Sequence, residues 1–504
     1  METEARVRWL SKLFLISISL FAAVTALPAA EYSDGQLSLE INLVSAAELK
    51  IKTAGEVSVC EADQLICRTI NSAFTISQVN PEAVTWFGIL DRKLSETEGV
   101  PDSTAVPKEF FAWENGKLQI KLEYLYFLPK SFSNRPEAEA YANSLGLPIS
   151  KVMEIPLINS TVKLTNAKGE SSYMETPLKL SFAGKMQING GELGYEGDFS
   201  LKTVKGKLVL NQLLSLEDYL AGVVQNEIGN TAPPEALKAQ AVAARTHALS
   251  LLANNRHKAD GYDLCSGTHC QVYKGKYLLN SYILQAIKDC EGEALFINCQ
   301  IADATYHSSC GGKTDASSAI WKTRPVAHLN GVTCIPEADS LDLSNEAQSR
   351  QWIDTKSDTA GMSSWERGAL SWEKSITRAQ LAANVGLKTI KRIEIVSRGR
   401  SGRILSLKLL GDKTVTLDSE YKIRQAFGNL LSSFFYIKGS YRQADNLTSI
   451  NPRATLSIKG KGAGHGVGMC QVGTLRLARL GVSYTNILQH YYPGTTLSKD
   501  WKNE

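Results

Sequence analysis

The sequence predicts an α+β protein in which a strand-rich accessory region, residues 31–189, precedes a mixed helix and strand domain, residues 190–500. Short apolar runs separated by Gly, Asn and Ser fill the accessory region and are typical of strands. The second region opens with two helix-length segments and continues into hairpin patterns with Gly turns. A length of 504 residues is enough for about two to four domains.

The first 30 residues carry the features of an export signal. Three basic residues up to Lys12 precede an apolar run, Leu13–Leu27, and small residues follow through Ala30. The run is shorter than the roughly 20 residues that span a bilayer comfortably. A cleaved signal peptide and an uncleaved membrane anchor both fit, and each places the rest of the chain outside the cytoplasm.

Charge and cysteine content limit the partners and the compartment. Lys and Arg number 55 against 51 Asp and Glu, and no Lys/Arg block occurs, so nucleic acid is not a predicted partner. Nine cysteines in an exported chain favour disulfides, although the odd number leaves at least one sulfur for another role. Cys60 can bridge locally to Cys67, and Cys310 to Cys334.

Strand patterns and one helix make up the accessory region. The strand patterns include LSLEINLV, KLQIKLEYLYF, STVKLTN and LKLSFAG. Pro136 opens the helical segment PEAEAYANSLG, in which Ala and Glu favour helix and Gly146 ends it. The region shows no catalytic constellation, and we expect a binding or spacer role.

A carboxylate stands on the apolar face of the helix predicted from Leu216. Its apolar stripe runs through Leu220 and Val224, and the next position on that stripe is Glu227. Burial there would favour the protonated acid and raise its pKa toward the range of a proton donor. A solvent-exposed glutamate at a helix end, just before Gly229, fits the pattern equally well.

A second helix follows the break at Gly229. Pro233 and Pro234 mark its start, and the alanine-rich segment EALKAQAVAARTHALSLL has the small faces of a buried helix. Further on, ALFINCQIADATYHSSCGGKT and RIEIVSRGRSGRILSLKLLGDKTVTL are predicted to form hairpins with Gly turns. This half of the chain is therefore of mixed α+β type.

Two cysteines and two histidines lie within fourteen residues, in HKADGYDLCSGTHCQVYKG. These four, His257, Cys265, His269 and Cys270, are a sufficient tetrahedral set for zinc. All four ligands would be protein groups, so such a site would be closed and structural. The spacing is not that of a zinc finger, and a Cys265–Cys270 disulfide beside two surface histidines is the alternative.

Glycines alternate along GKGAGHGVGMCQVGTLRLARLG, between an apolar strand and a helix that begins near Cys470. Neither nucleotide-loop pattern is present, because the third glycine of G-x-G-x-x-G falls on His465, Val467 or Met469. Alternate glycines do allow close approach of a backbone or a ligand. His465 is then either a structural residue of a packed hairpin or part of the lining of a cleft.

Hydroxyl side chains flank a predicted turn in YHSSCGGKT. Gly311 and Gly312 make the turn after a strand, and we expect Ser308, Ser309 and Thr314 to be exposed there. No G-x-S-x-G elbow or positioned base accompanies a nucleophilic serine. A polar sugar-binding edge and a plain turn both fit this segment.

Taken together, residues 190 to 500 resemble the family of stage II sporulation protein D, also called the amidase-enhancer or LytB-type domain. The first 190 residues lie outside the resemblance. The matching motifs occur in the family's order and are YEG at 195–197, LEDYL at 216–220, VVQNE ending at 227, ALKAQAVAARTHAL at 236–249, HCQVY at 269–273, YHSSCGG at 306–312, Gly402–Arg403, GHGVGMCQVG at 464–473 and ILQHYYPGT at 487–495.

The resemblance implies a function on peptidoglycan. In the family, the glutamate that closes the VVxxE segment is the catalytic acid of a lytic transglycosylase, and Glu227 holds that position here. The implied reaction cleaves the bond between N-acetylmuramic acid and N-acetylglucosamine in a cleft, acts on strands stripped of peptides by an amidase, and leaves a 1,6-anhydro end. The alternative is a non-catalytic glycan-binding protein that stimulates an N-acetylmuramoyl-L-alanine amidase.

The same resemblance implies further site residues. It favours the structural zinc at the four Cys and His ligands described above. The implied glycan-binding residues are His465, Gln471, Tyr273, Ser308 and Ser309. The implied location is extracytoplasmic, in the periplasm, in the cell wall or at the outer face of the cytoplasmic membrane.

Four positions depart from the family pattern. Ile228 replaces the usual Met after the catalytic glutamate, and Cys470 replaces a usual Ser. Ala463 and Val472 stand where aromatic residues are common. The loss of two aromatics removes stacking surface for sugar rings and predicts altered glycan affinity or subsite preference.

Overall fold

The computed structural model describes residues 32–33, 36–61, 67–79, 86–91, 105–114, 117–127, 134–144, 152–155, 161–254, 256–276, 280–439, 441–444, 447–450 and 452–499. The predicted export signal, residues 1–30, lies outside them. The chain divides into two compact units, one of residues 42–213 and one of residues up to 41 together with 214 onward. Each unit is described by itself.

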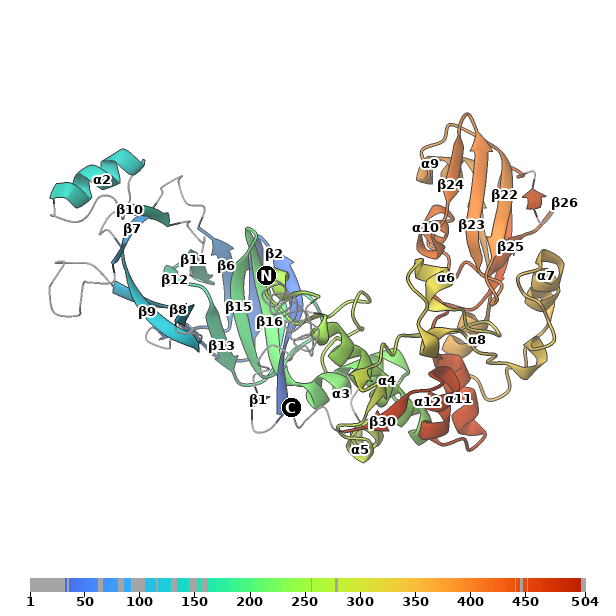
Figure 1. Ribbon diagram of the computed structural model, residues 1–504, viewed down its shortest axis with the longest axis horizontal. Coiled ribbons are helices and arrows are strands. Elements are labelled where there is room, and N and C mark those ends of the chain that lie inside the picture. Colours follow the sequence, from blue (N-terminus) through green and yellow to red (C-terminus); the bar gives the residue numbers. More distant parts are fainter. Residues whose placement is uncertain are drawn as a thin grey trace, which may run out of the picture. The chain divides into compact units, whose positions relative to one another are not determined.

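The unit of residues 42–213 is built on two antiparallel sheets (Figure 1). One has the order β2-β16-β15-β13-β4-β5 and the other the order β12-β11-β6-β3-β14. The first contains β2 (Gln36–Ala46), β4 (Val57–Glu61), β5 (Cys67–Ile70), β13 (Leu178–Phe182), β15 (Asp198–Val204) and β16 (Lys207–Ser215). The second contains β3 (Glu48–Thr53), β6 (Ala73–Gln78), β11 (Thr161–Asn166), β12 (Ser171–Glu175) and β14 (Met186–Ile188).

Alternation of apolar and polar residues explains why these two sheets pack face to face. In β3 the side chains alternate between exposed and buried along ELKIKT. Val59 and Leu180 of the first sheet share one core with Ile51 and Ile76 of the second, and all four are at most 2% exposed. The unit is therefore a sandwich whose core is the space between the sheets.

A further sheet and one helix belong to the same unit. The sheet has the order β10-β7-β9-β8 and contains β7 (Trp86–Asp91), β8 (Ala105–Glu114), β9 (Lys117–Phe127) and β10 (Val152–Ile155). The predicted helix is present as α2 (Arg135–Ser144), where Ala138 and Ala142 are buried. The strand-rich character predicted for this region is confirmed.

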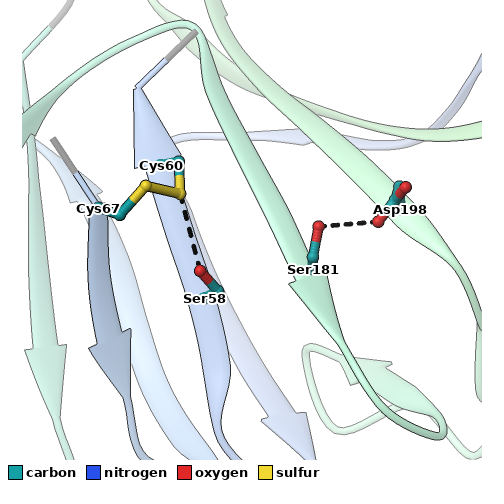
Figure 2. The surroundings of a disulfide bond; sticks show 5 residues. All are labelled: Ser58, Cys60, Cys67, Ser181 and Asp198. Carbon is teal, nitrogen blue, oxygen red and sulfur yellow. Dashed lines mark hydrogen bonds between the residues drawn. A yellow bond between two sulfur atoms is a disulfide. The ribbon is translucent and has the colours of Figure 1, made fainter. Parts of the chain in front are cut away.

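A disulfide joins Cys60 of β4 to Cys67 of β5, as the sequence allowed. The two residues face each other in the antiparallel register, so the bridge links neighbouring strands (Figure 2). On the same sheet, the Ser181 hydroxyl donates to the Asp198 carboxylate over 2.8 Å. The other local bridge that the sequence allowed is not formed, because Cys310 and Cys334 are both free thiols.

The second unit contains a helical layer around α4. The strand β16 leads into α3 (Leu216–Glu227), where Ser215 caps the helix by accepting from the Asp218 N–H. Pro233 and Pro234 begin α4 (Pro234–Ala253), which is buried along most of its length. Helices that pack on α4 are α3, α5 (Ser281–Asp289), α11 (Gln471–Arg479) and α12 (Tyr484–Tyr491).

The rest of this unit is a sheet region with its own apolar core. One sheet has the order β21-β28-β25 and the other β24-β23-β22-β27-β26. Their strands are β21 (Ser371–Thr377), β22 (Ile390–Arg398), β23 (Ile404–Gly411), β24 (Thr414–Leu417), β25 (Phe435–Ile437), β26 (Tyr441–Ala444), β27 (Leu447–Ile450) and β28 (Thr455–Lys461). Helices α9 (Arg378–Asn384) and α10 (Glu420–Ala426) contribute Leu381 and Ile423 to the core.

Short elements complete the unit. They are β1 (Tyr32–Ser33), β17 (Leu264–Cys265), β18 (Ala294–Ile297), β19 (Gln300–Ile301), α6 (Ser317–Trp321), α7 (Glu346–Asp354), α8 (Ser364–Leu370) and β30 (Thr496–Ser498). A two-residue parallel pair joins β20 (Tyr306–His307) to β29 (Met469–Cys470). This pair brings the YHSSCGG segment beside the glycine-rich segment.

These elements confirm the predicted α+β class, the two consecutive helices and the hairpins β18-β19 and β22-β23-β24. The unit boundary after Leu213 differs from the predicted one near residue 190, because β15 and β16 belong to the sandwich. Among the described residues, none of the helices has the length and apolar character needed to cross a membrane.

Candidate active site

Glu227 lies at the last turn of α3, on the side of the helix that faces the protein. The side chains of Leu220, Val223 and Val224 on the same helix are fully buried, and Glu227 itself is half-buried. Burial raises the pKa of the Glu227 carboxyl group above its ordinary value, while hydrogen bonds from its neighbours offset part of the rise. The structure therefore supports the buried acid and not the exposed helix end.

Three polar groups surround the Glu227 carboxyl group. The backbone N–H of Val272 donates to Oε1 over 2.9 Å, and Nε2 of Gln471 donates to Oε2 over 3.3 Å. The hydroxyl group of Tyr306 also interacts with this carboxyl group. These groups lie 34 to 199 residues apart in the sequence, so the site exists only in the folded chain.

A second layer of polar groups holds Gln471 and Tyr306 in place. Nε2 of Gln471 also donates to Oε1 of Gln240 over 3.3 Å, and the Tyr306 hydroxyl donates to Oε1 of Gln271 over 2.7 Å. Gln271 in turn donates to the Ala244 carbonyl of α4 over 3.2 Å. Each orienting group is held by another, so the carboxyl group has little freedom to reorient.

His247 and Asp303 lie beside this network. Nδ1 of His247 is 3.3 Å from a carboxylate oxygen of Asp303, and its ring meets the Tyr306 ring edge to face with centroids 6.3 Å apart. His247 also acts electrostatically on Glu227 and lowers its pKa, in opposition to burial. The sequence signals these residues only through their motifs, and neither was a predicted site residue.

Tyr273 packs against α3 and is 1% exposed. A Cβ atom at Gly222 would lie 2.3 Å from the Tyr273 ring, so glycine lets the ring lie directly on the helix. The Tyr219 ring of the same helix has its centroid 5.4 Å from that of the Tyr273 ring. Tyr273 thus supports the helix that carries Glu227. At this buried position its side chain does not provide the predicted contact with glycan.

Both ring nitrogens of His465 are engaged. Nε2 donates to the Tyr306 carbonyl over 2.9 Å, and Nδ1 accepts from the Val467 N–H over 3.1 Å. Burial holds the pKa of His465 well below its ordinary value, which keeps the ring neutral. Its outer face meets the Trp321 ring at 5.2 Å between centroids, and Trp321 is 41% exposed. Trp321 is an aromatic surface near the site that the sequence did not identify.

The predicted exposure of the hydroxyl groups around the Gly311 turn is wrong for two of three residues. Ser309 and Thr314 are each 1% exposed, and Ser308 is half-buried. Ser309 pairs with Ala463 through two backbone hydrogen bonds of 2.8 and 2.9 Å. The glycine-rich segment lies over the turn and covers it.

Arg403 explains how the two segments are joined. It is fully buried, and its guanidinium group donates to the carbonyl oxygens of Ser309, Cys310 and Gly464 over 2.9 to 3.2 Å. A Cβ atom at Gly466 would lie 2.4 Å from that guanidinium group. The alternate glycines therefore make room for an arginine and for a backbone, and not for a phosphate.

The four predicted metal ligands converge beside the same site. Donor atoms of His257, Cys265, His269 and Cys270 all lie within 4.8 Å of one another. Nε2 of His257 is 3.3 Å from Sγ of Cys270, and Nδ1 of His257 is 3.2 Å from the Asp260 carboxylate. A carboxylate behind a ligating imidazole is the usual outer partner at zinc sites.

The thiols of this Cys/His cluster are free and fit a metal. The Cys270 thiol beside Cys265 lowers the pKa of Cys265 to about 4, so one thiolate is available at neutral pH. The alternative disulfide between Cys265 and Cys270 is not formed. Two sulfurs and two imidazole nitrogens are a zinc-type donor set.

Comparison with known proteins finds two matched regions and several relatives. Residues 204–296 match the family described as stage II sporulation protein, and residues 314–468 match a domain of unknown function (DUF8618). The chain is 32% identical to the amidase enhancer of Bacillus subtilis over 302 residues, which are 55% of this chain and 40% of that protein. It is 28% identical to stage II sporulation protein D of Bacillus subtilis over 303 residues, 57% of this chain and 75% of that protein.

An uncharacterized protein of Brachyspira hyodysenteriae is 29% identical over 311 residues, 62% of this chain and 73% of that protein. The fold and the site define an α+β protein with a half-buried acid at a helix end, beside a Cys/His cluster. The chain carries a domain of the stage II sporulation protein D and amidase-enhancer family. Its match spans less than half of the amidase enhancer itself.

Proposed function

We propose that this protein is an extracytoplasmic lytic transglycosylase. Its substrate is the glycan strand of peptidoglycan, especially strands from which an amidase has removed the peptides. It cleaves the bond between N-acetylmuramic acid and N-acetylglucosamine and leaves a 1,6-anhydro end. Membership of the stage II sporulation protein D family supports a cell-wall-associated protein, and the site supports the chemistry.

One observation carries the proposal, namely the raised pKa of a single carboxyl group surrounded by donors. Hydrolysis of a glycoside normally requires two carboxyl groups, one acid and one base or nucleophile. The groups found in contact with Glu227 in the described residues are an N–H, an amide and a hydroxyl, which suit a single carboxyl group that gives up and takes back a proton. A lytic reaction needs only one.

The reaction balances with Glu227 acting twice. The protonated carboxyl group gives its proton to the glycosidic oxygen as the bond from that oxygen to C1 of the muramic acid breaks. The C6 hydroxyl oxygen of the same sugar then bonds to C1, and the hydroxyl proton passes to the Glu227 carboxylate. No water is consumed, and the acid returns to its starting state.

The surroundings of Glu227 suit both halves of this cycle. Burial favours the protonated acid that the first step needs. Val272 and Gln471 donate to the carboxylate that exists between the steps and stabilise it there. The two opposing influences thus act on the two protonation states that an acid must take when it also acts as base.

Zinc in the Cys/His cluster is part of the proposal. When bound, the ion would supply structural cross-linking only, because four protein ligands leave no open position for a water. His257, Cys265, His269 and Cys270 would hold it. These residues fix the loop that ends at Val272, whose N–H contacts Glu227.

The competing function is a non-catalytic one, in which the domain binds glycan and stimulates an amidase. The relative named amidase enhancer favours it, and a cell-wall amidase is a proposed partner under either function. The N-terminal segment, as signal peptide or anchor, would deliver the domain to the cell wall in both cases. Release of 1,6-anhydro ends distinguishes the two.

Amidase-treated sacculi incubated with the purified protein provide the test, and mass spectrometry detects the 1,6-anhydro ends. We expect release by the wild type and by Glu373→Gln, a control at an exposed glutamate of the same unit, and none by Glu227→Gln. Absence of anhydro ends with zinc-loaded wild type would refute the catalytic function. Bound glycan and a stimulated amidase would then support the enhancer.

A further inference from the structure

A second group of metal-type donors lies in the interior, away from the Cys/His cluster. Donor atoms of His307, Cys310 and Cys470 lie within 4.8 Å of one another, and all three side chains are at most 4% exposed. The parallel pair of β20 and β29 places His307 directly opposite Cys470. Residues about 160 positions apart are thereby brought into one small site.

Cys334 places a third sulfur beside this group, and its Sγ also lies 3.0 Å from the Tyr491 hydroxyl. It interacts with the thiols of both Cys310 and Cys470, and it is 7% exposed. A Cβ atom at Gly473 would lie 2.3 Å from Sγ of Cys334, and the Gly473 N–H donates to Sγ of Cys470 over 3.3 Å. Glycine at this position leaves room for Sγ of Cys334 and for the Tyr491 hydroxyl beside α11.

Backbone N–H groups are directed at two of the sulfurs. Sγ of Cys470 accepts from the N–H of Cys310 over 3.2 Å and from that of Gly473, at the N-terminus of α11. Sγ of Cys310 accepts from the Gly312 N–H over 3.3 Å. N–H donors and a helix N-terminus stabilise a thiolate far more than a neutral disulfide sulfur.

His307 presents an unused nitrogen to these sulfurs. Its Nδ1 lies 3.0 Å from the Val467 carbonyl, so Nδ1 carries the proton and Nε2 has a free lone pair. Nε2 has no hydrogen-bond partner in the described residues, although the side chain is 4% exposed. A carbonyl on one nitrogen and a lone pair on the other is the arrangement of a histidine that ligates a metal.

We propose that His307, Cys310 and Cys470, together with Cys334, form a second structural zinc site. Three thiolates and one imidazole are a known ligand set for closed tetrahedral zinc. The ion would accept the free lone pair of Nε2 and would balance the negative charge of the thiolates. Without a cation, thiolates and an unpaired nitrogen are costly to bury. Binding would release the thiol protons to solvent.

A cavity gives the ion a route to the site. It has a volume of about 550 Å³, and Cys310, Cys334 and Cys470 all contribute to its wall. Glu227 does not line this cavity, although Tyr306 and Gln471, which contact Glu227, are the chain neighbours of His307 and Cys470. The inference does not depend on the lytic activity.

The zinc content of the purified full chain tests the proposal by elemental analysis. With both sites loaded, we expect two zinc ions per chain for the wild type, one for Cys470→Ser and one for Cys265→Ser. Cys290→Ser is the matched control, since Cys290 is fully buried but outside both groups, and its content should equal that of the wild type. An unchanged content in Cys470→Ser would overturn the proposal, whatever the result for Cys265→Ser.

A measurement on the intact wild type covers the case in which Cys470→Ser does not fold. Alkylation of the native protein followed by mass spectrometry should show Cys310, Cys334 and Cys470 protected, and reactive once a chelator has removed the metal. Replacement by Co²⁺ should give thiolate charge-transfer absorption that Cys265→Ser retains. A disulfide between any two of these three cysteines in the non-reduced protein would refute the site and assign them a redox bridge.

Discussion

The backbone N–H of Val272 donates to the Glu227 carboxyl group over 2.9 Å, only two residues after Cys270 of the Cys/His cluster. The loop that the cluster folds therefore supplies part of the environment of the acid. A backbone donor cannot be removed by changing its side chain, so its position depends on the loop as a whole. This relationship links the cluster to the candidate active site through the backbone of one loop.

Removal of the metal from this cluster should reduce the activity. We expect Cys265→Ser to lower the rate of anhydro-end release by about tenfold or more, because loss of an outer orienting group costs about that much at related sites. The rate is measured on amidase-treated sacculi, with Cys299→Ser as control at an exposed cysteine outside the cluster. Full activity of metal-free Cys265→Ser would show that the loop keeps its position unaided.

Replacement of the acid should stabilise the protein as it abolishes the activity. Because the pKa of Glu227 is raised on folding, the wild type loses stability as pH rises from the unfolded value, about 4.3, through the folded value. Glu227→Gln has no such loss, so its Tm should exceed that of the wild type at pH 7 and approach it near pH 3. A lower Tm at pH 7 would contradict the desolvated acid.

The activity should decline on the alkaline side for the same reason. The first step needs the protonated carboxyl group, so the fraction of competent protein falls as pH rises through the raised pKa of Glu227. A pH profile of kcat/KM with saturating zinc checks this. A rate independent of pH up to about 8 would exclude Glu227 as the proton donor.

Gly222→Ala should damage the site through packing. The new methyl group would meet the Tyr273 ring at 2.3 Å, and overpacking of this kind costs about 1–3 kcal/mol, more than the roughly 1 kcal/mol that Ala gains in helix propensity. We expect a lower free energy of unfolding and a larger loss of activity than of stability, since α3 carries Glu227. Adding Tyr273→Leu should restore part of both, and strict additivity of the two changes would argue against the contact.

Trp321→Ala should weaken glycan binding. The exposed ring lies against His465 and offers the stacking surface that Ala463 and Val472 do not. Loss of one stacking contact corresponds to about 1 kcal/mol, or about a fivefold increase in Kd. The Kd for denuded glycan is measured in the Glu227→Gln background. Trp365→Ala is the control, because Trp365 is 40% exposed on α8. Equal effects of both changes would remove Trp321 from the binding surface.

The helix that carries the acid followed from the sequence, because the period of Leu220, Val224 and Glu227 is a local property. Its partners did not follow from local patterns. The N–H of Val272 belongs to the backbone and has no residue signature, and Gln471 reaches Glu227 across 244 residues. Such contacts depend on how α4 and α11 pack.

At the Gly311 turn, the local sequence pattern predicted the wrong exposure of the side chains. Small polar residues beside two glycines normally indicate an exposed turn, yet Ser309 and Thr314 are buried because another glycine-rich segment lies over them. The pairing of β20 with β29 causes both this burial and the convergence of His307 with Cys470. The paired residues are 163 positions apart, and this separation left no pattern from which the pairing could be predicted.

The sandwich of residues 42–213 begins and ends on neighbouring strands, since β2 and β16 are adjacent in one sheet. Asn42 of β2 donates to the carbonyl of Leu210 and the side chain of Asn211 in β16. A segment whose ends lie side by side can be lengthened, exchanged or excised and replaced by a short turn, with little distortion of the chain on either side. The unit that carries the candidate site and the sandwich can therefore diverge at different rates, so that the candidate site is preserved while the attached sandwich changes.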